Sequence, residues 1–394
     1  MGKGKKFPFP FPLFPFPHIL FMHIAIIGCG VVGAAVAYEL SQVPGLKITV
    51  FDPLPPAQAS TGAALGVLMG IISHKTKGKA WRMREQSIKT YEEWVPKLEA
   101  VSGRKIPFNR QGILMLLTLE DSSGQEGGSQ WEDLAAIRAK QGWQLEVWDT
   151  AKLKLACPQL NTEQIIGAVY SPCDRQLDPT TLTLALVDGA MSNGVSFKFG
   201  VEVNGFSPLS MNSSGVCQNI ETSDGKISVD KVIICAGLGS EALTEQLNQK
   251  IDIRPVLGQA IHFHVGRTLG NPDFQPAITG NDVHIVPCGA GIVPATDYWV
   301  GATVEFPNTD GYSLPPDAEL LESVKQQAIS FCPELAEATI TRTWSGLRPR
   351  PEGRPAPIIE KLPGYSNILV ATGHYRNGVL LAPATAVTIR EMII

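Results

Sequence analysis

A glycine-rich turn near the start of the chain constrains the fold more than any other feature. Gly28, Gly30 and Gly33 follow an apolar run, and a stretch typical of a helix, residues 32–42, comes next. In such a unit the first glycine permits the turn, the second lets amides approach a pyrophosphate, and the third lets the helix pack on the strand. Asp52 ends a second apolar run where an acid can hold a ribose hydroxyl. The pattern predicts a dinucleotide site for NAD or FAD, although a bare glycine motif also fits a packing turn.

Length and composition are those of a soluble globular protein. The 394 residues suit two domains. Hydrophobic residues make up 44% of the chain and the formal net charge is −4, so composition predicts no surface for nucleic acid. The seven cysteines form no CxxC pairs and the histidines lack metal-ligand spacing. We therefore expect reduced thiols in a cytoplasmic protein, and no metal site.

Residues 1–21 are rich in Phe and Pro and differ from the rest of the chain. Proline at every second or third position excludes a helix, so we expect neither a membrane span nor a signal peptide here. We expect a disordered, extended arm. Met22 directly precedes the first apolar run, so a translation start there would still give a complete domain. The other apolar runs are too short and interrupted to predict an integral membrane segment.

A second strand-to-glycine turn lies in the middle of the chain, where the apolar run 229–235 ends at Ala236 and Gly237. NAD enzymes usually need one such turn per nucleotide, whereas two-domain flavoproteins place several around one extended FAD. This turn favours FAD, while the first unit taken alone also fits an NAD-dependent dehydrogenase. A loop of small residues at 59–66 suits close approach to a bulky ligand, although it also fits a packing turn.

The remaining patterns predict the α/β class, α+β overall. Helices are expected at 81–102, 130–141, 179–192 and 317–331. Strands are expected at 113–117, 195–206, 216–222, 261–265, 284–287 and 299–304. The later strands alternate as in a mixed or antiparallel sheet. We therefore expect a Rossmann-like nucleotide-binding domain and a second domain built on such a sheet.

Three motifs carry a resemblance to a known family: GATVE at 301–305, GLRP at 346–349 and GHYRNGVLLAPAT at 373–385. Together with the opening glycines, and in this order, they make residues 22–394 similar to the D-amino-acid oxidase and glycine oxidase family of FAD enzymes. The glycine oxidase branch is the more similar one.

The resemblance implies FAD as the cofactor, and it implies a set of cofactor-binding residues. These are Gly28, Gly30, Val31, Val32, Gly33, Asp52, Ser60, Thr61, Gly62, Ala63, Val203, Ala236, Gly237, Gly373, His374, Arg376, Asn377, Gly378 and Val379. Val203 would lie beside the adenine, where an ordinary core valine is the alternative. A helix beginning near Leu380 would point its positive end at the flavin, where negative charge develops.

The same resemblance implies three catalytic residues, Arg348, Arg376 and His284. Arg348, in a motif of turn-forming residues, would clamp a substrate carboxylate, and Arg376 could assist it. A salt bridge is the alternative for each arginine. His284 stands where the family commonly has a tyrosine that joins the arginine at the carboxylate. A histidine can also donate a hydrogen bond but brings a charge that titrates near pH 6 to 7, and a strand histidine satisfied in a loop is the alternative.

The expected activity is oxidative deamination of glycine, sarcosine or a short D-amino acid by hydride transfer to flavin N5. The products would be an imino or oxo acid and, with oxygen as acceptor, hydrogen peroxide. A dehydrogenase that passes electrons to a quinone is the alternative, and an NAD-dependent dehydrogenase or a non-catalytic flavin-binding protein is less favoured. The sequence leaves open the amine, the acceptor and the oligomeric state, a homo-oligomer included.

By the same resemblance the FAD-binding domain is discontinuous. It would combine residues 22–86, 155–240 and 340–394. Residues 87–154 and 241–339 would form the substrate domain.

Overall fold

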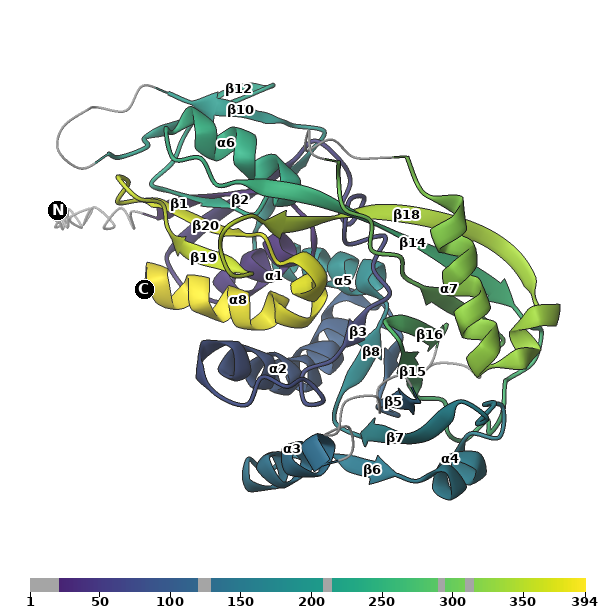
Figure 1. Cartoon of the computed structure of the whole chain (residues 1–394). Helices are drawn as coiled ribbons and strands as arrows, with labels where there is room; N and C mark the ends of the chain where they lie inside the picture. Colours follow the sequence, from purple (N-terminus) through teal and green to yellow (C-terminus); the bar gives the residue numbers. More distant parts are fainter. Residues whose placement is uncertain (1–20, 120–128, 208–214, 290–294, 309–314) are drawn as a thin grey trace, which may run out of the picture.

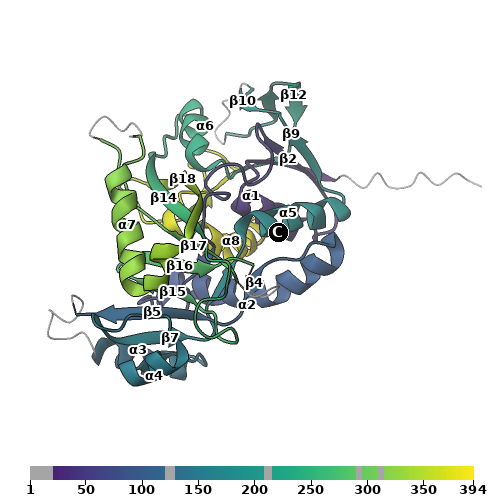
Figure 2. The same ribbon diagram turned by 90° about the vertical axis from the view of Figure 1, so that its right-hand side faces the viewer.

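The structure is a computed structural model that describes residues 21–119, 129–207, 215–289, 295–308 and 315–394. The arm predicted for residues 1–21 lies outside the described residues except for Phe21. Two large sheets and the helices packed on them form the molecule (Figures 1 and 2). Among the described helices, none is long and apolar enough to cross a membrane.

The first large sheet has six strands in the order β19-β20-β13-β1-β2-β9. The strands are β1 (Met22–Ile27), β2 (Leu46–Asp52), β9 (Ser196–Phe199), β13 (Lys231–Ile234), β19 (Ile358–Lys361) and β20 (Ile368–Thr372). All neighbours pair in parallel except β19 and β20. Because both faces of this sheet are covered, its central strands are apolar almost throughout, as β1 and β13 are.

Helices cover one face of the six-stranded sheet. They are α1 (Val31–Leu40), α2 (Gly78–Ser102), α5 (Pro179–Ser192) and α8 (Gly378–Ile393), which pack together below the strands in Figure 1. The opposite face carries α6 (Ser240–Gln246) and a small antiparallel sheet of β10 (Val203–Phe206), β11 (Asn219–Thr222) and β12 (Gly225–Ser228). This is the expected Rossmann-like arrangement.

The second large sheet has eight strands in the order β18-β14-β17-β16-β15-β5-β7-β6. They are β5 (Ile113–Thr118), β6 (Glu146–Trp148), β7 (Ile165–Ser171), β14 (Ile253–His264), β15 (Ala277–Gly280), β16 (Val283–Pro287), β17 (Asp297–Gly301) and β18 (Thr339–Pro351). Only β15 and β5 pair in parallel, which makes the sheet mixed, as expected. Helix α7 (Ala318–Phe331) packs on one face, where the sheet's core lies.

Smaller elements connect these layers. They are β3 (Val67–Leu68), β4 (Phe108–Asn109), β8 (Arg175–Leu177), α3 (Ser129–Lys140), α4 (Thr150–Ala156), and the 3₁₀ turns η2 (Gly237–Gly239), η3 (Pro333–Glu337) and η4 (Tyr375–Asn377). Strands β3, β8 and β4 form a three-stranded sheet of their own.

Two strand predictions differ from the structure. The strand expected at 195–206 is broken at Gly200, whose φ of +78° turns the chain, so that β9 and β10 belong to different sheets. Around Arg348 we expected turn-forming residues, but β18 runs straight through and pairs with β14 along its length. Prolines are tolerated there because β18 is an edge strand and its outer side needs no amide donors.

The predicted domain boundaries stay a prediction. Strands β7 and β18 come from segments expected in the FAD-binding domain, yet they pair within the eight-stranded sheet.

Candidate active site

A cavity of about 400 Å³ lies where the two large sheets meet, and both sheets line it. Most of the predicted cofactor residues line this cavity: Gly28, Gly30, Val31, Val32, Asp52, Ser60, Thr61, Ala63, Ala236, Gly237, Gly373, His374, Arg376, Gly378 and Val379. The predicted catalytic residues Arg348, Arg376 and His284 line it as well. The tertiary structure therefore brings together residues that lie more than 300 positions apart along the chain.

Glycine is required at the first turn of the cavity. Gly28 has a φ of +102°, and a Cβ there would lie 2.5 Å from the carbonyl oxygen of Cys235. A Cβ on Gly33 would lie 1.9 Å from the carbonyl oxygen of Gly28. Both positions therefore have the steric roles that the sequence predicted for them.

The first turn also brings a helix start and an acid to the cavity. Helix α1 begins at the cavity, and its N-cap, Gly30, supplies no side-chain cap. The amide of Val31 donates to Thr61 Oγ1 at 3.0 Å, which ties the small-residue loop to the helix start. Asp52 Oδ2 accepts a hydrogen bond from the amide of Cys29 at 2.6 Å, so its carboxylate is fixed beside the turn. A Cβ on Gly237, in the second turn, would meet nothing within 4 Å, so backbone there faces open space.

A second helix also begins at the cavity. Helix α8 starts at Gly378, its N-cap Asn377 makes no side-chain capping bond, and Val379 lines the cavity. The buried Tyr91 donates from its hydroxyl to the carbonyl of Val379 and so anchors this first helical turn. Two helix starts whose own N-cap residues make no side-chain capping bond lie beside glycine turns, and they fit a dinucleotide cofactor whose two ends both need donors.

His374 holds the last glycine turn against α8. Its Nε2 lies 2.9 Å from Thr385 Oγ1, and the residue is buried. Burial lowers the pKa of His374 to about 4, so the imidazole is neutral at physiological pH.

Arg348 extends from β18 and is fixed by backbone carbonyls. Its Nη1 donates to the carbonyls of Leu257 and Thr303, both at 3.1 Å. The guanidinium lies over Gly258, where a Cβ would come within 2.2 Å of Nη1. Burial, and then the positive charge of Arg376, lower the pKa of Arg348 below its usual value. Among the described residues Arg348 has no ion-pair partner, so the salt bridge weighed as its alternative is not formed.

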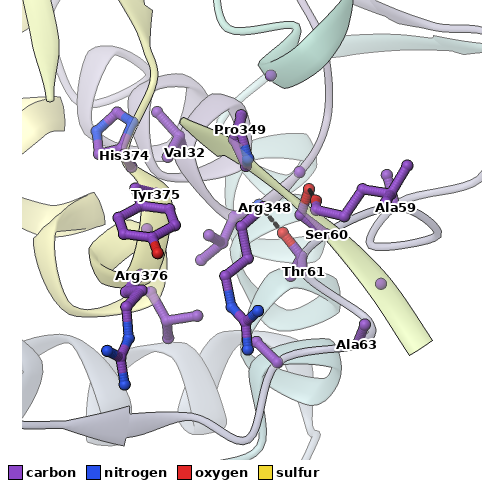
Figure 3. A pocket seen from close by; sticks show the side chains of 18 of the residues that line it. Val32, Ala59, Ser60, Thr61, Ala63, Arg348, Pro349, His374, Tyr375 and Arg376 are labelled. Atoms are coloured by element: carbon purple, nitrogen blue, oxygen red, sulfur yellow. Dashed lines mark hydrogen bonds between the residues drawn. The ribbon is translucent and has the colours of Figure 1, made fainter. Parts of the chain in front are cut away.

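Arg376 does form a salt bridge while it lines the cavity. Its Nη2 lies 3.0 Å from Asp282 Oδ1, and Nη1 lies 3.4 Å from Oδ2. The hydrogen bond from Arg376 lowers the pKa of Asp282. Figure 3 shows the side chains of Arg348 and Arg376 pointing toward the same side of the pocket, with the ring of Tyr375 nearby.

His284 lies on β16, and its Nδ1 is buried with no hydrogen-bond partner in the described part of the chain. Burial, and then the charge of Arg376, lower the pKa of His284 to about 4. The expectation that it titrates near pH 6 to 7 is therefore wrong, because this environment disfavours the charged imidazole. The alternative of a histidine satisfied in a loop is not what the structure shows.

Four predicted cofactor residues do not line the cavity. Gly33 and Gly62 pack against backbone, since a Cβ on Gly62 would lie 2.2 Å from the carbonyl oxygen of Ala57. Val203 is buried in the core as the first residue of β10, and Asn377 precedes α8. Sequence reasoning missed Tyr375, which lines the cavity between two predicted residues. Its place inside the GHYRNG motif was the available signal.

Among the residues described, no group of three or more His, Cys, Asp or Glu side chains could hold a metal ion.

Comparisons with known proteins agree with the geometry. Glycine oxidase of Bacillus licheniformis is 28% identical over 362 residues, which cover 91% of this chain and 89% of that protein. Glycine oxidase of Pseudomonas putida is 33% identical over 202 residues, half of each chain. The chain spans about half the length of the first curated relatives it matches. Among solved structures, glycine oxidase from Geobacillus kaustophilus has a TM-score of 0.80 at 24% identity and covers 94% of this chain and 95% of that one.

The family described as FAD dependent oxidoreductase matches residues 23–392, nearly the whole chain. This match confirms the resemblance inferred from the motifs and makes FAD the cofactor of the protein. The chain belongs to the FAD dependent oxidoreductase family.

Proposed function

We propose that this protein oxidises the Cα–N bond of a small amino acid: glycine, sarcosine or a short D-amino acid. The observation that carries the proposal is the partly buried guanidinium of Arg348, which lines the cofactor cavity and has no acidic partner among the described residues. A cation held in such a place favours binding of an anion, and a guanidinium matches a carboxylate through two parallel hydrogen bonds. The relatives named glycine oxidase support the same substrate class.

Within this proposal the protein positions its ligands and takes no covalent part. FAD, when bound, supplies the acceptor for two electrons. Arg348 holds the substrate carboxylate, so that the Cα–H bond of a neutral amine faces the cofactor and breaks with both electrons. The start of α8, where Asn377 makes no side-chain capping bond, would supply positive partial charge to the bound cofactor as negative charge develops on it. Water then hydrolyses the imino acid to an oxo acid and releases the amine nitrogen.

We also propose where FAD lies, which acceptor takes its electrons and where the protein is located. FAD would extend from the turn at Gly28 and Asp52 to the turn at Tyr375, with the discontinuous domain division expected above. Oxygen would be the electron acceptor and hydrogen peroxide its product. The seven cysteines are all free, which supports a cytoplasmic location.

An anaerobic substrate panel tests the proposal. The FAD-loaded protein is mixed with glycine, sarcosine, D-alanine, D-proline or L-proline, and the absorbance of oxidised flavin is followed. We expect at least one of the first three to bleach the flavin. If no amino acid does so, the protein binds flavin without oxidising amino acids. Aerobic turnover then distinguishes the acceptors, because an oxidase forms one hydrogen peroxide per amine consumed and a quinone-dependent dehydrogenase forms little.

A further inference from the structure

Two arginines line the cavity, but only one of them is free to bind an acidic substrate. Arg348 has no ion-pair partner in the described part of the chain, whereas both terminal nitrogens of Arg376 lie within 3.4 Å of the carboxylate of Asp282. The charge of Arg376 lowers the pKa of both Arg348 and His284, so the three groups share one electrostatic environment. Asp282 acts on both in the opposite sense and offsets the charge of Arg376 there.

The backbone, and not the ion pair alone, determines where Asp282 lies. Asn281 and Asp282 form the turn between β15 and β16, with φ angles of +47° and +61°. Asp282 therefore lies at the tip of the hairpin formed by β15 and β16, two residues before His284. The turn sets the backbone of Asp282, and the contacts with Arg376 hold its 72% exposed side chain beside that guanidinium.

We propose that Asp282 restricts the substrate to amino acids that carry a single carboxylate. It occupies the guanidinium that a second carboxylate would need, and it repels that carboxylate from the same space. The inference rests on the proposed function, in which Arg348 holds the first carboxylate. Without the charge of Asp282, the cavity would present two cations and would favour dicarboxylic ligands.

Three matched pairs of ligands test the inference. In each pair the second ligand has a carboxymethyl group where the first has a methyl group. Sarcosine is compared with iminodiacetate and D-alanine with D-aspartate as substrates, through their KM values. Acetate is compared with malonate as unreactive ligands, by calorimetry on the FAD-loaded protein. We expect the unsubstituted protein to bind each dicarboxylate more weakly than its partner.

Asp282→Asn is the informative variant. Asparagine adopts positive φ more readily than most residues, so the turn is retained while the charge is lost. We expect the affinity ratio of dicarboxylate to monocarboxylate to rise roughly tenfold or more. The double variant Asp282→Asn with Arg376→Gln should lose this gain, because the second carboxylate then has no guanidinium.

Asp252→Asn is the matched control, since Asp252 pairs with Arg254 away from the cavity and the ratio should not change. An unchanged ratio in Asp282→Asn would overturn the inference, and so would a gain that persists in the double variant. The comparison of acetate with malonate tests the role of Asp282 separately from the proposed function, because it measures binding and needs no turnover. If no amino acid bleaches the flavin, the proposed function fails, while the binding ratio of the two acids still decides the role of Asp282.

Discussion

At the scale of single residues, the position of Arg348 in the cavity depends on the absence of a side chain at Gly258 as well as on its hydrogen-bond partners. Gly258 leaves the space that the guanidinium of Arg348 occupies, and the carbonyls of Leu257 and Thr303 orient it. Sequence reasoning identified Arg348 from its motif but gave no role to Gly258. The two are 90 positions apart and become neighbours only through the pairing of β14 with β18.

Gly258→Ala should therefore displace Arg348 without removing it. The added Cβ would lie 2.2 to 2.4 Å from three atoms of the guanidinium, so the side chain must move. We expect KM for the amino acid to rise roughly tenfold or more, which corresponds to about 1.4 kcal/mol of lost binding. Steady-state kinetics and the flavin content of the purified protein measure this. Arg348→Ala should show a larger effect on KM with flavin retained, and unchanged kinetics in both variants would remove Arg348 from the substrate site.

Two neutral histidines should make the fold sensitive to acid. His284 and His374 both have a pKa of about 4 in the folded protein, against about 6.5 when unfolded. The unfolded chain therefore binds more protons between these values, and stability falls as the pH drops from 6.5 toward 4. The loss is about 2 kcal/mol per histidine between pH 7 and pH 5.

Thermal unfolding at pH 7 and at pH 5 checks this pH dependence. His374→Gln keeps a hydrogen-bonding group near Thr385 but does not titrate, so the difference between the two midpoints should shrink. If the midpoints of His374→Gln at pH 7 and pH 5 differ as much as those of the unsubstituted protein, His374 is not the source of the pH dependence.

At the scale of elements, a buried carboxylate and a buried guanidinium together hold the segment between β3 and α2. Asp174 accepts hydrogen bonds from the amides of Gly70, Ile71 and Ile72 at 2.7 to 2.8 Å. Arg138 donates to backbone carbonyls of the same segment and lies over the ring of Trp81. Sequence patterns gave no sign of this arrangement, because its members come from three separate parts of the chain.

Asp174→Ala should destabilise the protein strongly, since it leaves three buried amides without their charged acceptor. We expect the free energy of unfolding to fall by about 3 kcal/mol or more. Urea titration of the FAD-loaded protein measures the change. Asp273→Ala, at an exposed position, should change it by no more than about 0.5 kcal/mol. Equal effects of the two substitutions would contradict the role given to Asp174.

The helices and strands were easier to predict from the sequence than the strands with which they pair or pack. The helix that begins at Pro179 was expected because Asp178 precedes a proline, and Asp178 accepts a hydrogen bond from the amide of Thr181 at 2.6 Å. The break at Gly200 and the strand through Arg348 were not expected. A single glycine or proline is compatible with a turn, a bulge or an edge strand, and the neighbouring strands determine which of these forms.

At the scale of the whole molecule, the cofactor cavity joins the two large sheets. Its lining includes the turn that follows β13, the start of α8 and parts of β14, β16 and β18. A ligand that binds here contacts both sheets, so its binding free energy adds to the stability of the assembled molecule.

Removal of FAD should therefore loosen both sheets at the cavity. We expect a lower thermal midpoint and faster hydrogen exchange at residues 235–239 and 346–349, which line the cavity from different sheets. Exchange mass spectrometry of the loaded and stripped protein measures this. Faster exchange confined to the six-stranded sheet would contradict a cofactor that lies between the two.

The sequence by itself determined the cofactor class, the Rossmann-like unit and the family. The Rossmann-like unit depends on glycines and a helix start whose steric requirements are local and can be recognised within a few dozen residues. FAD and the family followed from the resemblance carried by three motifs. Only the tertiary structure decided which arginine is free, because Arg376 meets Asp282 across 94 positions of the chain. It also decided that His284 is neutral, since burial and neighbouring charge come from packing and leave no trace in a local pattern.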